Sequence, residues 1–166
     1  MNYKIVVMGV SGCGKSSVAS KIAERLSIPF VDGDDYHSEE SIRKMSSGTP
    51  LTDEDRFSWL NRLNGIIKEN DQLVLACSSL TPTYRDILRK GNPELRFVYL
   101  QGTLDVIWPR MSERSNHYFS GLDLLKSQFK TLIEPTEEEA IIIPIDQPVD
   151  DVVMQAVEQL SSIEMS

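Results

Sequence analysis

The sequence predicts a single α/β domain built on a mostly parallel sheet. The chain has 166 residues, which suits one domain with its own core. Short apolar runs alternate along it with amphipathic stretches, the pattern of repeated strand–helix units. The apolar runs lack a clean period of two, as expected for strands that are buried on both faces of a parallel sheet.

Strand and helix candidates follow one another along the whole chain, without a repeat, a linker or a low-complexity tract, so we expect one domain over 1–166. The expected strands are Lys4–Met8, Pro29–Val31, Gln72–Cys77, Leu95–Gln101 and Ala140–Ile145. The expected helices are Lys15–Leu26, Glu39–Ser46, Asp53–Glu69, Pro82–Arg89, Leu104–Glu113, Leu122–Ile133 and Val149–Leu160.

Capping residues and prolines refine these boundaries. Thr52 is suited to cap the helix that follows it, and Thr81 with Pro82 reads as an N-cap followed by proline at the first helical position. Pro144 is tolerable near the end of the last strand if that strand lies at a sheet edge. Pro109 should kink or shorten its helix.

Composition excludes several classes of function. The net charge of −8 makes general nucleic-acid binding a poor prediction. No run approaches the roughly 20 apolar residues of a membrane span, and the chain opens on a strand-like segment without a charged leader, so we expect a cytoplasmic protein. Cys13 and Cys77 lack metal-ligand spacing and are expected to be free thiols.

A phosphate-binding loop lies between the first expected strand and the first expected helix. Gly9 to Ser16 match G-x-x-x-x-G-K-S/T in full. The loop amides and Lys15 suit nucleotide phosphates, and the Ser16 hydroxyl suits Mg²⁺, whereas a glycine-rich turn without a ligand is the alternative. The nucleotide-binding residues expected here are Gly9, Ser11, Gly12, Cys13, Gly14, Lys15, Ser16 and Ser17.

An acidic segment, Asp32 to His37, follows the second expected strand. The carboxyl ends of parallel strands face the ligand crevice, so one carboxylate there can hold Mg²⁺ and another can accept a proton from an attacking hydroxyl. A simple Asp- and Gly-rich turn is the alternative. His37 is suited to contact a substrate oxygen, or is only a surface or capping imidazole.

The chain closely resembles the bacterial and eukaryotic gluconate kinases over nearly its whole length. The resemblance is carried by the loop at 8–12 and most specifically by the segment from Lys44 to Leu60. Further matches are Asp32-Gly33-Asp34-Asp35-Tyr36-His37, Tyr84-Arg85-Asp86, Ser127-Gln128-Phe129 and Ile145-Asp146-Gln147-Pro148.

This resemblance implies an adenylate-kinase- or shikimate-kinase-like fold with a five-stranded parallel sheet flanked by helices. It implies a substrate-binding helical region at about 36–70 and a mobile lid at about 112–122. The implied reaction is phosphorylation of the 6-hydroxyl of D-gluconate by ATP with Mg²⁺, and the implied assembly is a homodimer.

Roles carry over by position from the resemblance. Asp34 is expected to be the general base, and Asp32 to join Ser16 around Mg²⁺. Arg56 is expected to hold the substrate carboxylate, with a surface ion pair as the alternative. Lys44 and Arg85 are expected to add positive potential in the cleft, or to be ordinary solvated helix charges.

The expected lid and base site involve a second set of residues. Arg110 and Arg114 share a helix face, with Arg114 suited to stabilise the transferring phosphoryl group and Arg110 to lie over adenine, unless the face is merely solvated. His117 corresponds to the family's lid histidine. The loop expected beside adenine is Asp146, Gln147 and Pro148.

The chain also departs from the family pattern. Leu80-Thr81-Pro82-Thr83 stands where a Leu-Lys-Lys stretch is usual, and Pro109 and the segment 117–119 also differ. These departures leave open a shikimate-like or nucleoside monophosphate kinase of the same fold. A non-catalytic nucleotide switch also stays open, although the guanine-reading Asn-Lys-x-Asp signature is absent, as does a non-catalytic paralogue that binds a partner.

Overall fold

The computed structural model describes residues 3–49, 51–114 and 118–165, with side chains described outside 111–121 and 163–165. Strands and helices alternate as expected. In chain order they are β1 (Lys4–Met8), α1 (Lys15–Leu26), β2 (Phe30–Asp32), the 3-10 helix η1 (Gly33–Tyr36), α2 (Glu39–Ser46), α3 (Asp53–Glu69), β3 (Leu73–Ala76), α4 (Pro82–Arg89), β4 (Leu95–Gln101), α5 (Leu104–Arg114), α6 (Tyr118–Thr131), β5 (Ala140–Pro144) and α7 (Val149–Met165).

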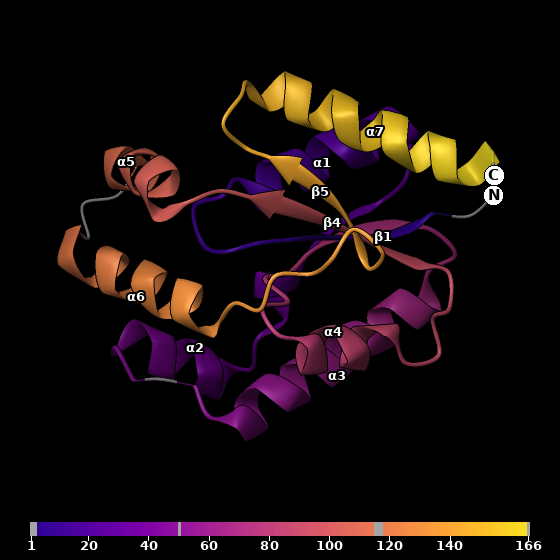
Figure 1. Cartoon of the computed structure of the whole chain (residues 1–166). Coiled ribbons are helices and arrows are strands. Elements are labelled where there is room, and N and C mark those ends of the chain that lie inside the picture. The colour runs from indigo at the N-terminus through magenta and orange to yellow at the C-terminus, as the bar shows by residue number, and fades with distance from the viewer. Residues whose placement is uncertain (1–2, 50, 115–117, 166) are drawn as a thin grey trace.

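The strands form a five-stranded sheet in the order β2-β3-β1-β4-β5, and every pairing is parallel. This confirms the predicted fold class. Helices α1 and α7 cover one face of the sheet, and α3 and α4 cover the other (Figure 1). The strand order reverses direction around β1, which is where open α/β sheets form their ligand crevice.

Two apolar cores lie on the two faces of the sheet. Alternate residues of β1 enter them: Ile5 and Val7 pack with α1 and α7, whereas Val6 and Met8 pack with α3 and α4. All four side chains are fully buried. The absence of a polar face on β1 therefore explains why its sequence shows no alternation.

Several helix boundaries differ from the expected ones, and α7 continues to Met165 instead of ending at Leu160. Helix α5 runs through Pro109 to Arg114, one residue beyond the expected end, so Pro109 does not shorten it, and the alternative of a kink stays a prediction. Burial of Ile107, with Leu104, Val106 and Trp108 packed on the same core, outweighs the one backbone hydrogen bond that a proline removes. Helix α6 begins earlier than expected, at Tyr118, and ends at Thr131.

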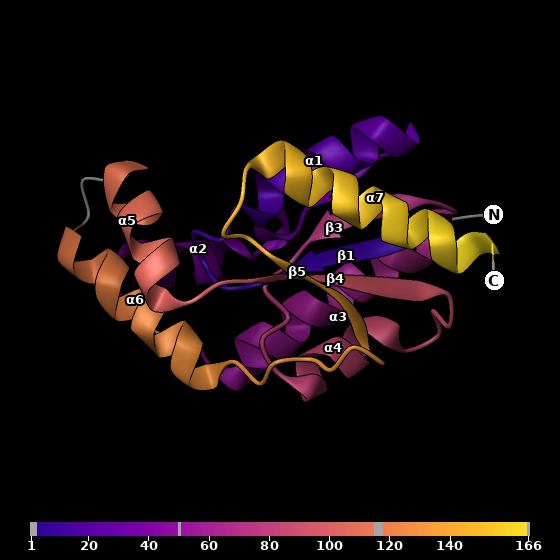
Figure 2. The ribbon, with the colours of Figure 1, turned by 45° about the horizontal axis from the view of Figure 1, so that its top comes forward.

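All five strands point their carboxyl ends toward the same edge of the sheet. Helices α5 and α6 extend beyond this edge, as an arm separate from the two helical layers (Figure 2). The loops that follow β1, β2 and β5 open at the same edge and carry the glycines of the phosphate loop, Asp34 with His37, and 146–148. Within the described residues, no helix is long and apolar enough to cross a membrane.

Candidate active site

The phosphate loop joins the central strand β1 to the N-terminus of α1. Gly14 is the N-cap residue of α1 and has φ 87°, a left-handed conformation that glycine adopts without a steric penalty. The first glycine of the loop is tied to the segment that follows β3, since the Gly9 N–H donates to the Ser78 carbonyl at 3.3 Å. The loop amides, the helix N-terminus and Lys15 thus form an anion-binding site.

Ser16, in the first turn of α1, and Asp32, the last residue of β2, come together at the edge of the sheet. Ser16 Oγ donates to Asp32 Oδ2 at 3.2 Å, and the other Asp32 oxygen accepts from the Asp34 N–H at 3.0 Å. A hydroxyl and a carboxylate side by side, next to a phosphate loop, are the oxygen donors that Mg²⁺ prefers. The residues present therefore fit the ion expected from the sequence.

Asp34 follows in η1, with its side chain 74% exposed. His37 Nε2 lies 3.8 Å from Asp34 Oδ1. The His37 imidazole beside it, helped by the charge of Lys15, holds the pKa of the Asp34 carboxyl below its usual range. Asp34 is therefore an accessible carboxylate that is ionised at neutral pH.

The His37 side chain is nearly buried and lies next to Asp34. It is only 7% exposed and stacks on Trp59, with ring centroids 4.2 Å apart and planes 17° apart. Trp59 Nε1 in turn donates to the Gly33 carbonyl at 2.8 Å. The prediction that His37 contacts a substrate oxygen stays untested, whereas its contact with Asp34 is present. Sequence reasoning did not identify Trp59 as part of the site.

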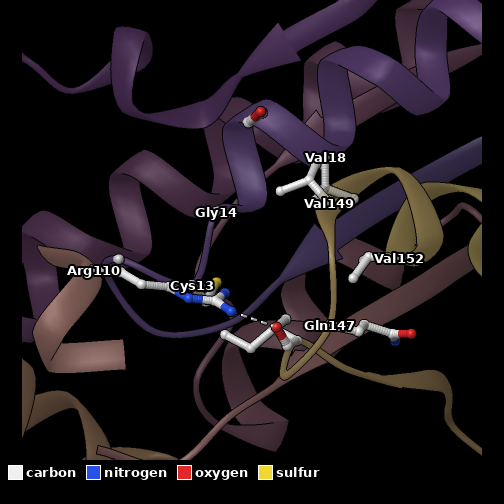
Figure 3. A pocket seen from close by; sticks show the side chains of 10 residues that line it. Cys13, Gly14, Val18, Arg110, Gln147, Val149 and Val152 are labelled. Carbon is white, nitrogen blue, oxygen red and sulfur yellow. Dashed lines mark hydrogen bonds between the residues drawn. The ribbon is translucent and has the colours of Figure 1, made fainter. Parts of the chain in front are cut away.

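A small pocket lies beside the phosphate loop, where the nucleotide base is expected from the sequence to bind (Figure 3). Arg110 reaches across it beside Cys13, and its Nη2 donates to the Ile145 carbonyl at 2.9 Å. Gln147 lines the pocket, whereas Asp146 and Pro148 flank it as exposed residues. The lining residues are Gly12, Cys13, Gly14, Ser17, Val18, Arg110, Ile145, Gln147, Val149 and Val152.

A larger polar hollow of about 530 Å³ lies between α2 and α3. Lys44 lines it and is already paired, because its Nζ lies 2.8 Å from Asp55 Oδ2. The Lys44 ammonium and the Thr52 backbone N–H lower the pKa of Asp55 to about 2. Arg62 also lines the hollow and lies over the Tyr36 ring, a contact that sequence reasoning missed.

Arg56 lies outside the lining of that hollow, with its side chain 41% exposed. Its Nη1 is 3.8 Å from Asp53 Oδ1, which matches the alternative of a surface ion pair with a preceding acid. Such a long, solvated contact contributes little to stability. Arg56 is therefore free to exchange Asp53 for a ligand carboxylate at small cost, and its expected role stays a prediction.

Arg85 is placed differently from both sequence expectations. Its side chain is 1% exposed and pairs with Glu139, while Nη1 donates to the Ser79 carbonyl at 2.9 Å. It is neither a cleft cation nor a solvated helix charge, because Glu139 neutralises it inside the fold. Arg85 instead holds Ser79, which has φ 50°, next to the Ser78 carbonyl that anchors Gly9.

The expected lid residues fall largely outside the described part of the chain. His117 lies outside the described residues, and Arg114 ends α5 in the stretch without described side chains. Further along the arm, Gln128 Oε1 accepts from the Ser11 N–H at 2.6 Å. Gln128 entered the sequence analysis only within a matched motif, and no local pattern pointed to this contact with the phosphate loop.

The parallel sheet, the phosphate loop, the Ser16–Asp32 pair and an ionised, accessible Asp34 together define a P-loop kinase. The sequence profile of the shikimate kinase family matches residues 11–160. The chain is 45% identical to thermoresistant gluconokinase of Escherichia coli over 92% of this chain and 90% of that protein. It is 48% identical to thermosensitive gluconokinase of the same organism over 85% of this chain and 77% of that protein. The chain therefore belongs, within that kinase family, to the gluconokinases.

The fold comparison agrees with the sequence relatives. The crystal structure of a gluconokinase from Sinorhizobium meliloti 1021 superposes with a TM-score of 0.90, at 42% identity, over 97% of this chain and 93% of that one. A shikimate kinase from Aquifex aeolicus reaches a TM-score of 0.66 at 17% identity, over 97% of this chain and 98% of that one, which supports the shared fold alone. The family resemblance expected from the sequence is confirmed.

Proposed function

We propose that this chain transfers the terminal phosphoryl group of ATP to the 6-hydroxyl of D-gluconate, giving 6-phospho-D-gluconate. The observation that carries the proposal is the meeting of three groups at one sheet edge: the phosphate loop with Lys15, the Ser16–Asp32 pair, and the ionised Asp34. The gluconokinase relatives support gluconate over shikimate as the acceptor.

Asp34 is the proposed general base. Its lowered pKa makes it a weak base, so it does not ionise the hydroxyl beforehand. It orients the hydroxyl and accepts the proton as the new O–P bond forms, which suits a loose phosphoryl-transfer transition state. His37 and Trp59 hold Asp34 in place, and Lys15 offsets negative charge on the phosphates.

Ser16 and Asp32 would hold the proposed metal, Mg²⁺. When bound, the ion would neutralise negative charge on the phosphates. Arg110 and Gln147 are proposed to contact the base. Helices in 36–70 are proposed to bind the acceptor, with Arg56 holding its carboxylate and Lys44 adding positive charge. Residues 112–122, including Arg114 and His117, are proposed to form a lid that excludes water.

A homodimer in the cytoplasm is the proposed assembly and location. Both proposals come from the sequence and the family resemblance. Analytical ultracentrifugation at micromolar concentration tests the first, with a single species at the mass of one 18.7 kDa chain contradicting it.

The acceptor is tested by ADP release with MgATP, comparing D-gluconate with shikimate, other sugar acids and nucleoside monophosphates. The expected result is rapid turnover with gluconate and none above background with shikimate. Turnover with another acceptor alone would support kinase activity but contradict gluconate as the acceptor. In that case Thr81 and Pro82, which form the N-terminus of α4 where the family carries lysines, are the first residues to exchange.

A further inference from the structure

Helix α6 contacts the phosphate loop through the carboxamide of Gln128. The 2.6 Å hydrogen bond from the Ser11 N–H to Gln128 Oε1 joins residues that are 117 positions apart in the chain. Backbone amides of this loop are the groups that bind phosphate oxygens. The Gln128 oxygen thus occupies a donor that belongs to the nucleotide site.

The position of Ser11 indicates which phosphate competes for this donor. The lining of the base pocket begins at Gly12 and continues through Gly14 and Ser17, so Ser11 lies beyond the base end of the loop. The phosphate chain must lead from the base toward Asp34, where the acceptor binds in the proposed reaction. The Ser11 N–H is therefore suited to the terminal phosphate of ATP rather than to the phosphate nearest the base.

The core fixes the helix position but leaves the Gln128 carboxamide free to turn. Leu125, one turn before Gln128, is fully buried, and Phe129, directly after it, packs on the same core. Gln128 itself is only partly buried. A rotation about the last side-chain torsion exchanges the carboxamide oxygen for its NH₂ group without moving α6.

We propose that Gln128 is a specificity-determining residue that distinguishes ATP from ADP. When ATP binds, an oxygen of the terminal phosphate takes the Ser11 N–H, and the turned carboxamide donates Nε2–H to the same phosphate. ADP lacks this phosphate, so it leaves the Ser11–Gln128 hydrogen bond intact. The inference rests on the proposed use of ATP and assigns no contact to the acceptor.

Gln128→Glu separates the two proposed roles of the side chain, which are to accept from the Ser11 N–H and to donate to the terminal phosphate. The carboxylate has nearly the same shape and still accepts from Ser11, but it cannot donate and it repels phosphate. Because a hydrogen bond to a charged group contributes about 10- to 100-fold in affinity, Kd for a non-hydrolysable ATP analogue with Mg²⁺ should rise at least about tenfold. Kd for ADP should change by less than about threefold.

Isothermal titration calorimetry measures these dissociation constants. Two further variants, Gln128→Leu and Ser127→Ala, are measured in the same way. Gln128→Leu should also weaken binding of the ATP analogue about tenfold, while the Kd for ADP should change by less than about threefold, because ADP does not use the Ser11 N–H in this proposal. Ser127→Ala, an exposed neighbour on α6, should change neither. An ATP-to-ADP affinity ratio equal to that of the unsubstituted chain in both Gln128 variants overturns the proposal, whatever their melting temperatures.

These binding ratios do not depend on the acceptor. If gluconate is not the substrate, the unsubstituted chain shows no gluconate-dependent ADP release, yet the affinity ratios still report on Gln128. Failure of the further inference and failure of the proposed function are therefore distinguishable.

Discussion

Replacing Glu139 by glutamine tests whether the buried charge of Arg85 depends on its carboxylate. Arg85 is 1% exposed, so the variant leaves a charged guanidinium inside the fold without its counter-charge, although the Ser79 carbonyl and the new amide oxygen can still accept from it. The variant also removes the charge that Arg89 meets at 3.2 Å. Breaking a fully buried ion pair costs about 3–5 kcal/mol. Because the Glu139 side chain is 26% exposed, water compensates in part, and we expect a loss of about 2–4 kcal/mol.

Thermal and urea unfolding monitored by circular dichroism measure this loss. For a chain of this size, the expected change lowers Tm by about 5–15 °C. Asp86→Asn is a matched control, because Asp86 is 73% exposed and its pair with Arg89 lies at the surface, where the loss should stay below about 1 kcal/mol. Equal effects of the two variants would refute the reasoning, as would a Glu139→Gln protein as stable as the unsubstituted chain.

Three further predictions concern the proposed active site and α2–α3. Asp34→Asn should cut kcat with gluconate by about 10²-fold or more while the Kd for MgATP changes by only a few-fold; near-normal turnover would exclude Asp34 as the base. His37→Gln should raise the pKa of Asp34 toward its ordinary value, since His37 is the main cause of the lowered pKa; ¹³C NMR titration of the carboxyl measures this, and an unchanged midpoint contradicts it. Asp55, whose pKa Lys44 lowers to about 2, should stabilise the fold fully above its ordinary pKa of about 3.9 and progressively less as pH falls to about 2. Urea midpoints of the unsubstituted chain and Asp55→Asn should therefore converge over that range, and a constant difference would refute the assignment.

Most of the fold followed from patterns that act over short distances. The strand β1, the cap at Thr52 and the helix start at Thr81-Pro82 are local signals, and the structure shows all three, including a capping box between Thr52 and Asp55. The expected helix Leu104–Glu113 included Pro109, but local signals could not decide whether the proline would shorten it, because that depends on how the core buries the helix.

In the candidate site, too, features encoded by neighbouring residues were predictable, whereas contacts between distant residues were not. The phosphate loop carries its own chemistry in eight consecutive residues, and the meeting of Ser16 with Asp32 follows from parallel strands ending at one edge. The role of Arg85 did not follow, because its partner Glu139 lies 54 residues away. The contact of Gln128 with Ser11 spans an even longer separation, which no periodicity or motif spacing encodes.

The edges of the sheet limit how copies of this chain can associate. At one edge, β2 has only three residues, and at the other, β5 ends in Pro144, which has no amide hydrogen to offer a further strand. Both edges are therefore poor templates for strand addition, which protects the native chain from edge-to-edge aggregation. Any specific assembly of these subunits is thus expected to join helical surfaces rather than to extend the sheet.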